Sequence, residues 1–285
     1  MLRRAARAFP PQLQQGLRRL GRLRWLEKSR QLRNRRPGGP PIGALEAARY
    51  VLLSPEVGDF TYDLANEDEL LDVLADALEL PRAELAAYAE EAHSDPLLTA
   101  SLSRRRHRRL DVKRRIELGR NIGSYIVVRA VKPRLVVETG IKHGVGSLAL
   151  LVALERSASE GHDGRLISYD VAPGSGWLVP AELHHRWEVV LAPTEQALEE
   201  ELTGREVDVF VHDTPPDEHR ERLEYEAALR HAGSRLVLLS NNGDNTLVLP
   251  RIAAERGMRY RHFAERPANH WYLGPGMGVA VHAGR

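Results

Sequence analysis

Beyond the dipeptide Lys132-Pro133, short apolar runs rich in β-branched residues recur along the chain, and helical stretches lie between most of them. Proline disfavours helical geometry in the residue before it, so this dipeptide ends the long helix that we expect over residues 110–131. Buried strands that alternate with helices indicate a parallel sheet covered on both faces. The last two runs are close in sequence, which favours antiparallel pairing at one edge. The expected strands are Leu135–Glu138, Leu166–Asp170, Trp187–Leu191, Val207–His212, Leu236–Leu239, Tyr260–Phe263 and Met277–His282.

Residues 1–131 have a different pattern. Residues 44–102 have helical periodicity, with Asn66 as a candidate N-cap for a helix over 67–78 and Pro81 opening another helix. Residues 37–41, Pro-Gly-Gly-Pro-Pro, are typical of a linker. We therefore divide the chain into a basic helix or tail with its linker (1–41), a helical cap region (42–131) and an α/β domain (132–285).

The charge of the chain is unevenly distributed. Residues 1–37 hold eleven arginines, one lysine and one acid, a charge of +11, and because the whole chain is +2 the remainder carries −9. Such a segment can contact an anionic surface of membrane headgroups, nucleic acid or an acidic protein. It can equally dock on the acidic body of its own chain or of a partner in a homo-oligomer, and the sequence leaves both interpretations open.

Three further features concern the cellular setting. No apolar run is long enough for a transmembrane segment, and no apolar stretch of a secretory signal follows the basic start. The chain has no cysteine, which excludes disulfides and thiolate metal sites. We expect a cytoplasmic protein.

A glycine-rich turn follows the first strand. Glu138-Thr139-Gly140 leads to Gly144 and Ser147, and a helix begins there. Glycines let the backbone turn sharply and let a ligand approach the helix N-terminus. Residues 144–149 satisfy G-x-G-x-x-A, the dinucleotide pattern, but Gly144 lies six residues beyond the strand end instead of directly at it. An acid at Glu138 would repel a pyrophosphate, whereas it can bind the ammonium of an amino-acid-bearing cofactor.

Asp170 ends the second strand. A carboxylate at this position can accept hydrogen bonds from both hydroxyls of a ribose, and it would serve either kind of cofactor. It can also do no more than cap the next loop.

These residues carry a resemblance to a known family. The stretch from Lys132 to Val281 resembles the class I S-adenosylmethionine-dependent methyltransferases, and more narrowly the bacterial small-molecule and sugar O-methyltransferases and the cephalosporin-hydroxylase-like proteins. The matching segments are KPRLVVETGIKHGVGS, LISYD, VDVFVHD, RLEYEAAL and RLVLLSNN. The first is the most specific.

The resemblance implies a Rossmann-like, doubly wound, mostly parallel seven-stranded sheet and a role in natural-product biosynthesis. It implies that Glu138, Gly140 and Gly144 line the methionine part of S-adenosyl-L-methionine, that Asp170 holds the ribose, and that Asp213 faces the transferred methyl. We add Thr139 and Ser147, which belong to the same turn, as candidate cofactor-binding residues.

Methyl transfer from a sulfonium needs positioning more than acid–base chemistry, although a hydroxyl acceptor benefits from a base or a metal. Asp213, which ends the strand 207–212, is the first candidate base, and His212 beside it is expected on the opposite face of the sheet. Relatives often continue this strand as Asp-x-Asp-His, and their next strand often ends in Asp-Asp or Asp-Asn. Here prolines 215 and 216 replace the second acid and the histidine, and Asn241-Asn242 ends the next strand. Neutral amides are poor ligands for a hard cation, so we expect no tightly bound divalent metal.

His270 is the alternative base, since it lies among aromatic residues before the glycines 274 and 276. Our first hypothesis is an S-adenosylmethionine-dependent methyltransferase that acts on oxygen of a small molecule or sugar. A catalytically inactive binding or scaffold protein with the same fold is the alternative, because the second acid and the histidine of the family motif are missing. An NAD-linked oxidoreductase and a nucleic-acid methyltransferase fit the sequence less well.

Overall fold

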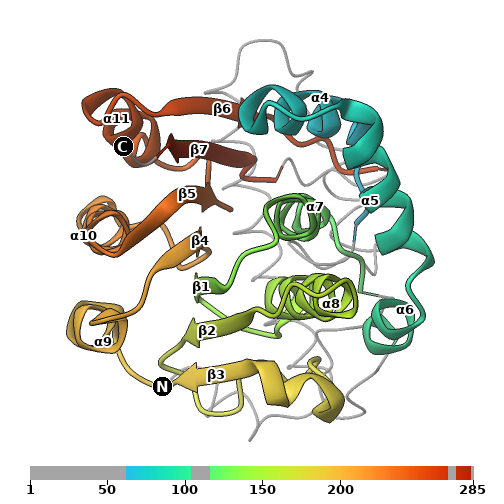
Figure 1. Cartoon of the computed structure of the whole chain (residues 1–285), viewed down its shortest axis with the longest axis horizontal. Coiled ribbons are helices and arrows are strands. Elements are labelled where there is room, and N and C mark those ends of the chain that lie inside the picture. Colours follow the sequence, from blue (N-terminus) through green and yellow to red (C-terminus); the bar gives the residue numbers. More distant parts are fainter. Residues whose placement is uncertain (1–61, 104–115, 269–273, 284–285) are drawn as a thin grey trace, which may run out of the picture.

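A seven-stranded sheet runs through the middle of the protein, with helices on both of its faces (Figure 1). The structure is a computed structural model that describes residues 62–103, 116–268 and 274–283. The strand order is β3-β2-β1-β4-β5-β7-β6, and β7 runs antiparallel to both β5 and β6 while the other neighbours are parallel. The predicted Rossmann-like fold, with its antiparallel edge, is confirmed.

All seven predicted strands are present, and their ends differ from the predicted ends by at most four residues. The strands are β1 (Leu135–Thr139), β2 (Arg165–Tyr169), β3 (Trp187–Val190), β4 (Val207–His212), β5 (Ala232–Ser240), β6 (Arg259–Phe263) and β7 (Met277–Ala283). The helices are α4 (Glu67–Leu78), α5 (Arg82–Ser94), α6 (Pro96–Leu102), α7 (Asn121–Val131), α8 (Val145–Ser159), the 3₁₀ helix η3 (Ala181–Arg186), α9 (Thr194–Leu202), α10 (Glu218–Arg230) and α11 (Val248–Glu255).

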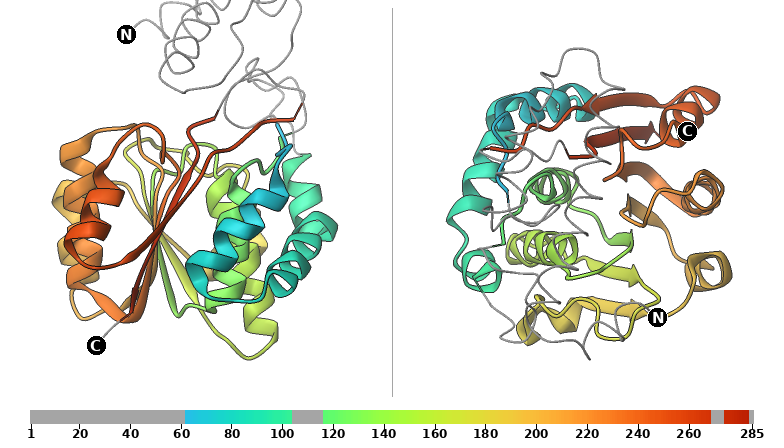
Figure 2. Two further views of the ribbon diagram at one scale, coloured as in Figure 1. Left: turned by 90° about the horizontal axis from the view of Figure 1, so that it is seen from above. Right: turned by 180° about the vertical axis from the view of Figure 1, so that it is seen from behind.

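The helices divide between the two faces of the sheet. Helices α9, α10 and α11 cover one face, and α4, α7 and α8 cover the other, with α5 and α6 packed outside α7 and α8 (Figures 1 and 2). Leucines of α4 and α5, such as Leu70 and Leu85, belong to the same apolar core as Leu148 of α8 and Val136 of β1. The helices before residue 132 thus share a core with the sheet, and the domain boundaries drawn from the sequence stay predictions.

The single helix predicted over residues 110–131 is wrong. Residues 116–118 are not helical, the Asn121 N–H donates to the Leu118 carbonyl in a turn (3.0 Å), and α7 begins at Asn121. Gly119 interrupts the helical pattern and has a low helix propensity. The predicted end holds, since Lys132 adopts a left-handed conformation before Pro133.

The segment before α4 is held to the segment after β6. Leu64 forms a β-bridge with Pro267, and Asn66 accepts the Arg266 N–H (2.8 Å) and donates to the Ala264 carbonyl (3.0 Å). Asn66 precedes α4 as predicted, but its side chain makes these bonds rather than an N-cap bond. Residues 62–66 therefore lie beside the C-terminal part of the chain. Within the described residues, no helix is long and apolar enough to cross a membrane.

We predict that Arg129→Ala lowers the free energy of unfolding by about 2–3 kcal/mol, since it removes a buried guanidinium together with its bonds to two carboxylates and a serine hydroxyl. Arg129 is 2% exposed, and its guanidinium donates to Glu91 (2.6 Å), Glu160 and Ser157 (3.0 Å). The control is Arg82→Ala, which breaks solvent-exposed pairs with Asp68 and Asp72 and should cost clearly less stability than Arg129→Ala. Urea unfolding measures both, and equal losses would contradict the prediction.

Candidate functional site

Three neighbouring parallel strands end at one level of the sheet. Thr139 of β1 is in register with Tyr169 of β2 and His212 of β4, so the next residues, Gly140, Asp170 and Asp213, lie together. The Gly140 N–H donates to the Tyr169 carbonyl (2.9 Å), and the Asp213 N–H donates to the Thr139 carbonyl (2.8 Å). The structure therefore brings together the turn and two of the acids that the sequence singled out.

Two glycines of the turn have backbone conformations that disfavour other residues. Gly140 has a φ of 89°, and a Cβ at this position would lie 2.5 Å from the carbonyl oxygen of Asp213. Gly144, the N-cap of α8, has a φ of 87°, and its Cβ would lie 2.8 Å from the Cα of Gly176. The turn is thus packed against the end of β4 on one side and against the loop after β2 on the other.

The side chain of Glu138 is buried beneath this turn, with 1% exposure. Its Oε2 accepts hydrogen bonds from the hydroxyls of Ser147 (2.5 Å) and Ser168 (2.8 Å). Its Oε1 points at the first turn of α8, 2.8 Å from where a Cβ on Gly146 would be, and Asn121 and Asp213 also approach that position. The Glu138 carboxyl therefore approaches the N-terminus of α8 from the sheet.

Burial raises the pKa of Glu138 to about 8, and the charges of Asp213 and Asp170 add to this rise, while the two serine hydroxyls oppose it. The carboxyl is thus mostly protonated at neutral pH in the unliganded protein. A cation placed beside it would favour the ionised form.

Asp170 holds the loops on both sides of it. Its Oδ2 accepts the N–H groups of Ile141 (3.0 Å) and Lys142 (2.9 Å), and its Oδ1 accepts that of Ala172 (2.8 Å). Partial burial acts to raise the pKa of Asp170, but these bonds outweigh it and the pKa lies below its usual value. The ionised carboxylate is therefore part of the framework of the glycine turn.

Asp213 lies beside a cluster that the sequence did not indicate. Arg120 Nη2 is 3.5 Å from Asp213 Oδ1, and its Nη1 donates to the Tyr62 hydroxyl (3.2 Å) and lies 3.8 Å from Glu265 Oε1. Tyr62 in turn donates to Glu265 Oε2 (2.9 Å). Tyr62, Arg120 and Glu265 are buried, whereas the Asp213 side chain is 25% exposed. These three residues come from loops far apart in sequence, where no periodic pattern could mark them.

The side chains of the remaining predicted site residues are bonded within the protein or lie outside the described residues. The Thr139 hydroxyl donates to Glu224 on the α10 face, so any ligand contact of Thr139 comes from its backbone. Ser147 is fully buried, and its hydroxyl donates to Glu138. The expectation that His212 faces the opposite side of the sheet is confirmed, since it contacts Glu224 there. His270 lies outside the described residues.

The two asparagines at the end of β5 are engaged within the protein. Asn241 donates to Asn121 Oδ1 (3.2 Å), and Asn242 donates to the Thr214 carbonyl (2.7 Å). The Asn241 Oδ1 is buried and has no hydrogen-bond partner among the described residues. Over residues 62–103, 116–268 and 274–283, no group of three His, Cys, Asp or Glu side chains is arranged to hold a metal ion.

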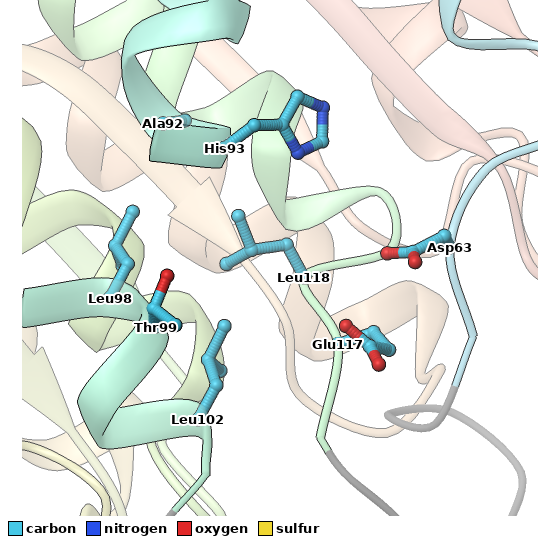
Figure 3. A pocket seen from close by; sticks show the side chains of 8 residues that line it. All are labelled: Asp63, Ala92, His93, Leu98, Thr99, Leu102, Glu117 and Leu118. Carbon is cyan, nitrogen blue, oxygen red and sulfur yellow. The ribbon is translucent and has the colours of Figure 1, made fainter. Parts of the chain in front are cut away.

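A separate small pocket lies where α5 and α6 meet the segment before α7. Asp63, His93, Glu117 and Leu118 are among the residues that line it (Figure 3). Its volume is about 30 Å³, which suits water but not a nucleoside. None of the predicted site residues lines it, so we place the candidate site at the strand ends.

Comparison with known proteins identifies a family over the central part of the chain. Residues 137–242, which span the turn and all three acids, match the model of a family described as a methyltransferase domain. The predicted resemblance to class I S-adenosylmethionine-dependent methyltransferases is confirmed over this range. No curated protein matches the chain.

Several solved structures have a similar fold. Cofactor-bound Rv0187 from MTB is 18% identical, with 72% of this chain and 98% of that chain covered and a TM-score of 0.49. The O-methyltransferase from Bacillus cereus in complex with SAH is 17% identical, with 75% and 96% covered and a TM-score of 0.46. TomG, an O-methyltransferase from Streptomyces achromogenes in complex with SAM, is 14% identical, with 70% and 96% covered and a TM-score of 0.48.

We predict that Glu138→Gln makes stability less dependent on pH. The pKa of Glu138 is about 8 in the folded protein and has its usual value of 4.5 in the unfolded chain, so the folded state binds the extra proton between these values. Wild-type stability therefore falls with rising pH in that window, by up to about 1.4 kcal/mol per pH unit relative to the variant. Urea unfolding of both proteins from pH 5.5 to 7.5 measures the difference, and parallel curves would refute the assignment.

Proposed function

We propose that this protein is an S-adenosylmethionine-dependent methyltransferase that acts on an oxygen of a small molecule or sugar. One observation carries the proposal: the acids Glu138, Asp170 and Asp213 lie at the carboxyl ends of three adjacent parallel strands, around a glycine turn that opens α8. The match of residues 137–242 to a methyltransferase domain supports it. Oxygen as the acceptor rests on the resemblance of the sequence motifs to small-molecule and sugar O-methyltransferases.

The side chains present at the site fit this cofactor. Hydrogen-bond acceptors predominate there: Asp213, Asn241 Oδ1, which has no partner among the described residues, and Glu138 Oε1 once a cation ionises that carboxyl. They suit an ammonium and a sulfonium better than a pyrophosphate. Asp170 would accept the ribose hydroxyls. Because the Ala172 N–H already donates to Asp170 Oδ1, ribose binding would compete with that loop contact.

S-adenosylmethionine, when bound, supplies a methyl group already activated by the positive sulfur. The protein then has to orient the acceptor and exclude water. Asp213 Oδ1 lies 3.5 Å from the Arg120 guanidinium, and we assign Asp213 to the orientation of positive charge and of the acceptor rather than to strong proton abstraction. His270 remains the candidate base for a hydroxyl acceptor.

We predict micromolar binding of S-adenosylmethionine and S-adenosylhomocysteine in calorimetry, and no binding of NADH. Asp170→Ala should weaken binding at least about tenfold, since it removes the ribose acceptor and frees the N–H groups of Ile141 and Lys142. Asp208→Ala is a matched control, because Asp208 Oδ2 also accepts two successive N–H groups, those of Arg134 and Leu135, at the other end of β1. Wild-type protein that binds neither sulfur ligand would overturn the proposed function.

Methyl transfer is tested with labelled S-adenosylmethionine and a panel of phenols, sugars, amines and thiols. We expect label on hydroxyl acceptors, and a rate about 100-fold lower for Asp213→Asn because the acceptor loses its orientation. Asp217→Asn, which changes only the exposed N-cap of α10, should stay within about twofold of wild type. EDTA should not change the rate. Label on nitrogen or sulfur alone would exclude the O-methyltransferase assignment.

A further inference from the structure

A buried polar network lies on the α10 face of the sheet, at the end of β1 that leads into the Gly140 turn. Glu224 of α10 is 1% exposed, and its carboxylate is bonded to three other elements. Oε2 accepts the Thr139 hydroxyl at the end of β1 (2.8 Å) and lies 2.7 Å from Nδ1 of His212 at the end of β4. Oε1 accepts the hydroxyl of Thr194, the first residue of α9 (2.6 Å). One carboxylate thus connects the ends of two central strands with two helices.

The two strand ends that Glu224 joins are two of the three that carry the candidate site. Thr139 precedes Gly140, and His212 precedes Asp213. Gly140 and Asp213 are packed so closely that a Cβ on Gly140 would lie 2.5 Å from the Asp213 carbonyl oxygen. A small shift of β1 along β4 would therefore disturb the turn and Asp213 together.

A second buried carboxylate on α10 provides a comparison. Glu221 is fully buried and accepts the Thr246 hydroxyl (2.6 Å), but its Oε2 is 4.0 Å from His212 Nε2, beyond hydrogen-bond distance. Within the described part of the chain, no hydrogen bond connects Glu221 to β1. Burying a carboxylate is costly unless it is well bonded, and among these two only Glu224 uses its bonds to join β1 to β4.

We infer that Glu224 is a positioning residue of the cofactor site, which acts through Thr139 and His212 to hold the Gly140 turn against Asp213. The inference rests on the proposed function, because the ligand whose binding reports on the turn is S-adenosylhomocysteine. Glu224 lies on the α10 face of the sheet, and it acts without touching the cofactor.

The test is a double-mutant cycle on S-adenosylhomocysteine affinity, measured by calorimetry with thermal unfolding as the check on folding. Thr139→Val removes the hydroxyl at nearly constant volume, Glu224→Ala removes its acceptor, and the double variant removes both. We expect each single variant to weaken binding about tenfold and the double variant to be no weaker than about tenfold. Glu221→Ala, the matched control, should lower the melting temperature yet keep affinity within about twofold.

Two results would overturn the inference while leaving the proposed function intact. The first is wild-type affinity for S-adenosylhomocysteine in Glu224→Ala. The second is an affinity about a hundredfold weaker in the double variant, which would mean that Thr139 and Glu224 act independently. If Glu224→Ala does not fold, Thr139→Ser decides, because it keeps the hydroxyl and should recover most of the affinity that Thr139→Val loses. Failure of Thr139→Ser to recover affinity would also overturn the inference. Absence of binding by the wild type would instead reject the proposed function and the inference with it.

Discussion

Strand β1 is hydrogen-bonded on both sides, by β2 and by β4, and the geometry of the strand ends depends on this central position. Its register sets Thr139 level with Tyr169 and His212, and the chain then turns at Gly140. Because the next N–H groups still bond across the strands, Gly140 to Tyr169 and Asp213 to Thr139, the turn cannot move without breaking sheet pairing. A rigid sheet thereby fixes residues that belong formally to loops.

Alternation along β1 places two polar residues on opposite faces of the sheet. Glu138 points toward α8, where Ser147 and Ser168 donate to it, and Thr139 points toward α10, where Glu224 accepts from it. Such groups destabilise a core unless they are bonded, and both are. The end of β1 is therefore held from both faces of the sheet, by one network that reaches the N-terminus of α8 and by one that reaches the carboxyl end of β4.

The fold could be predicted because its signals are local: apolar runs of strand length, a proline at 133 and glycines at the turn. Features that depend on contacts between distant segments could not be predicted in this way. Tyr62, Arg120 and Glu265 lie in coil segments and meet only in the folded chain, and the Gly119 break in the predicted 110–131 helix is a single residue within a helical pattern. Asp170 and Asp213 could be located from their strand ends, but their bonding to the turn and to Arg120 depends on tertiary packing.

The charges at the strand ends are unbalanced, with three acids facing the turn and Arg120 as the cation that the described contacts place against Asp213. The protein tolerates this because burial holds the pKa of Glu138 near 8, so that one of the acids carries a proton at neutral pH. A bound ammonium or sulfonium would favour the ionised carboxylate, and a proton would leave as the cation enters. On the proposed function, the cofactor replaces that proton, and the buried carboxylate gains its counter-charge only when the ligand is in place.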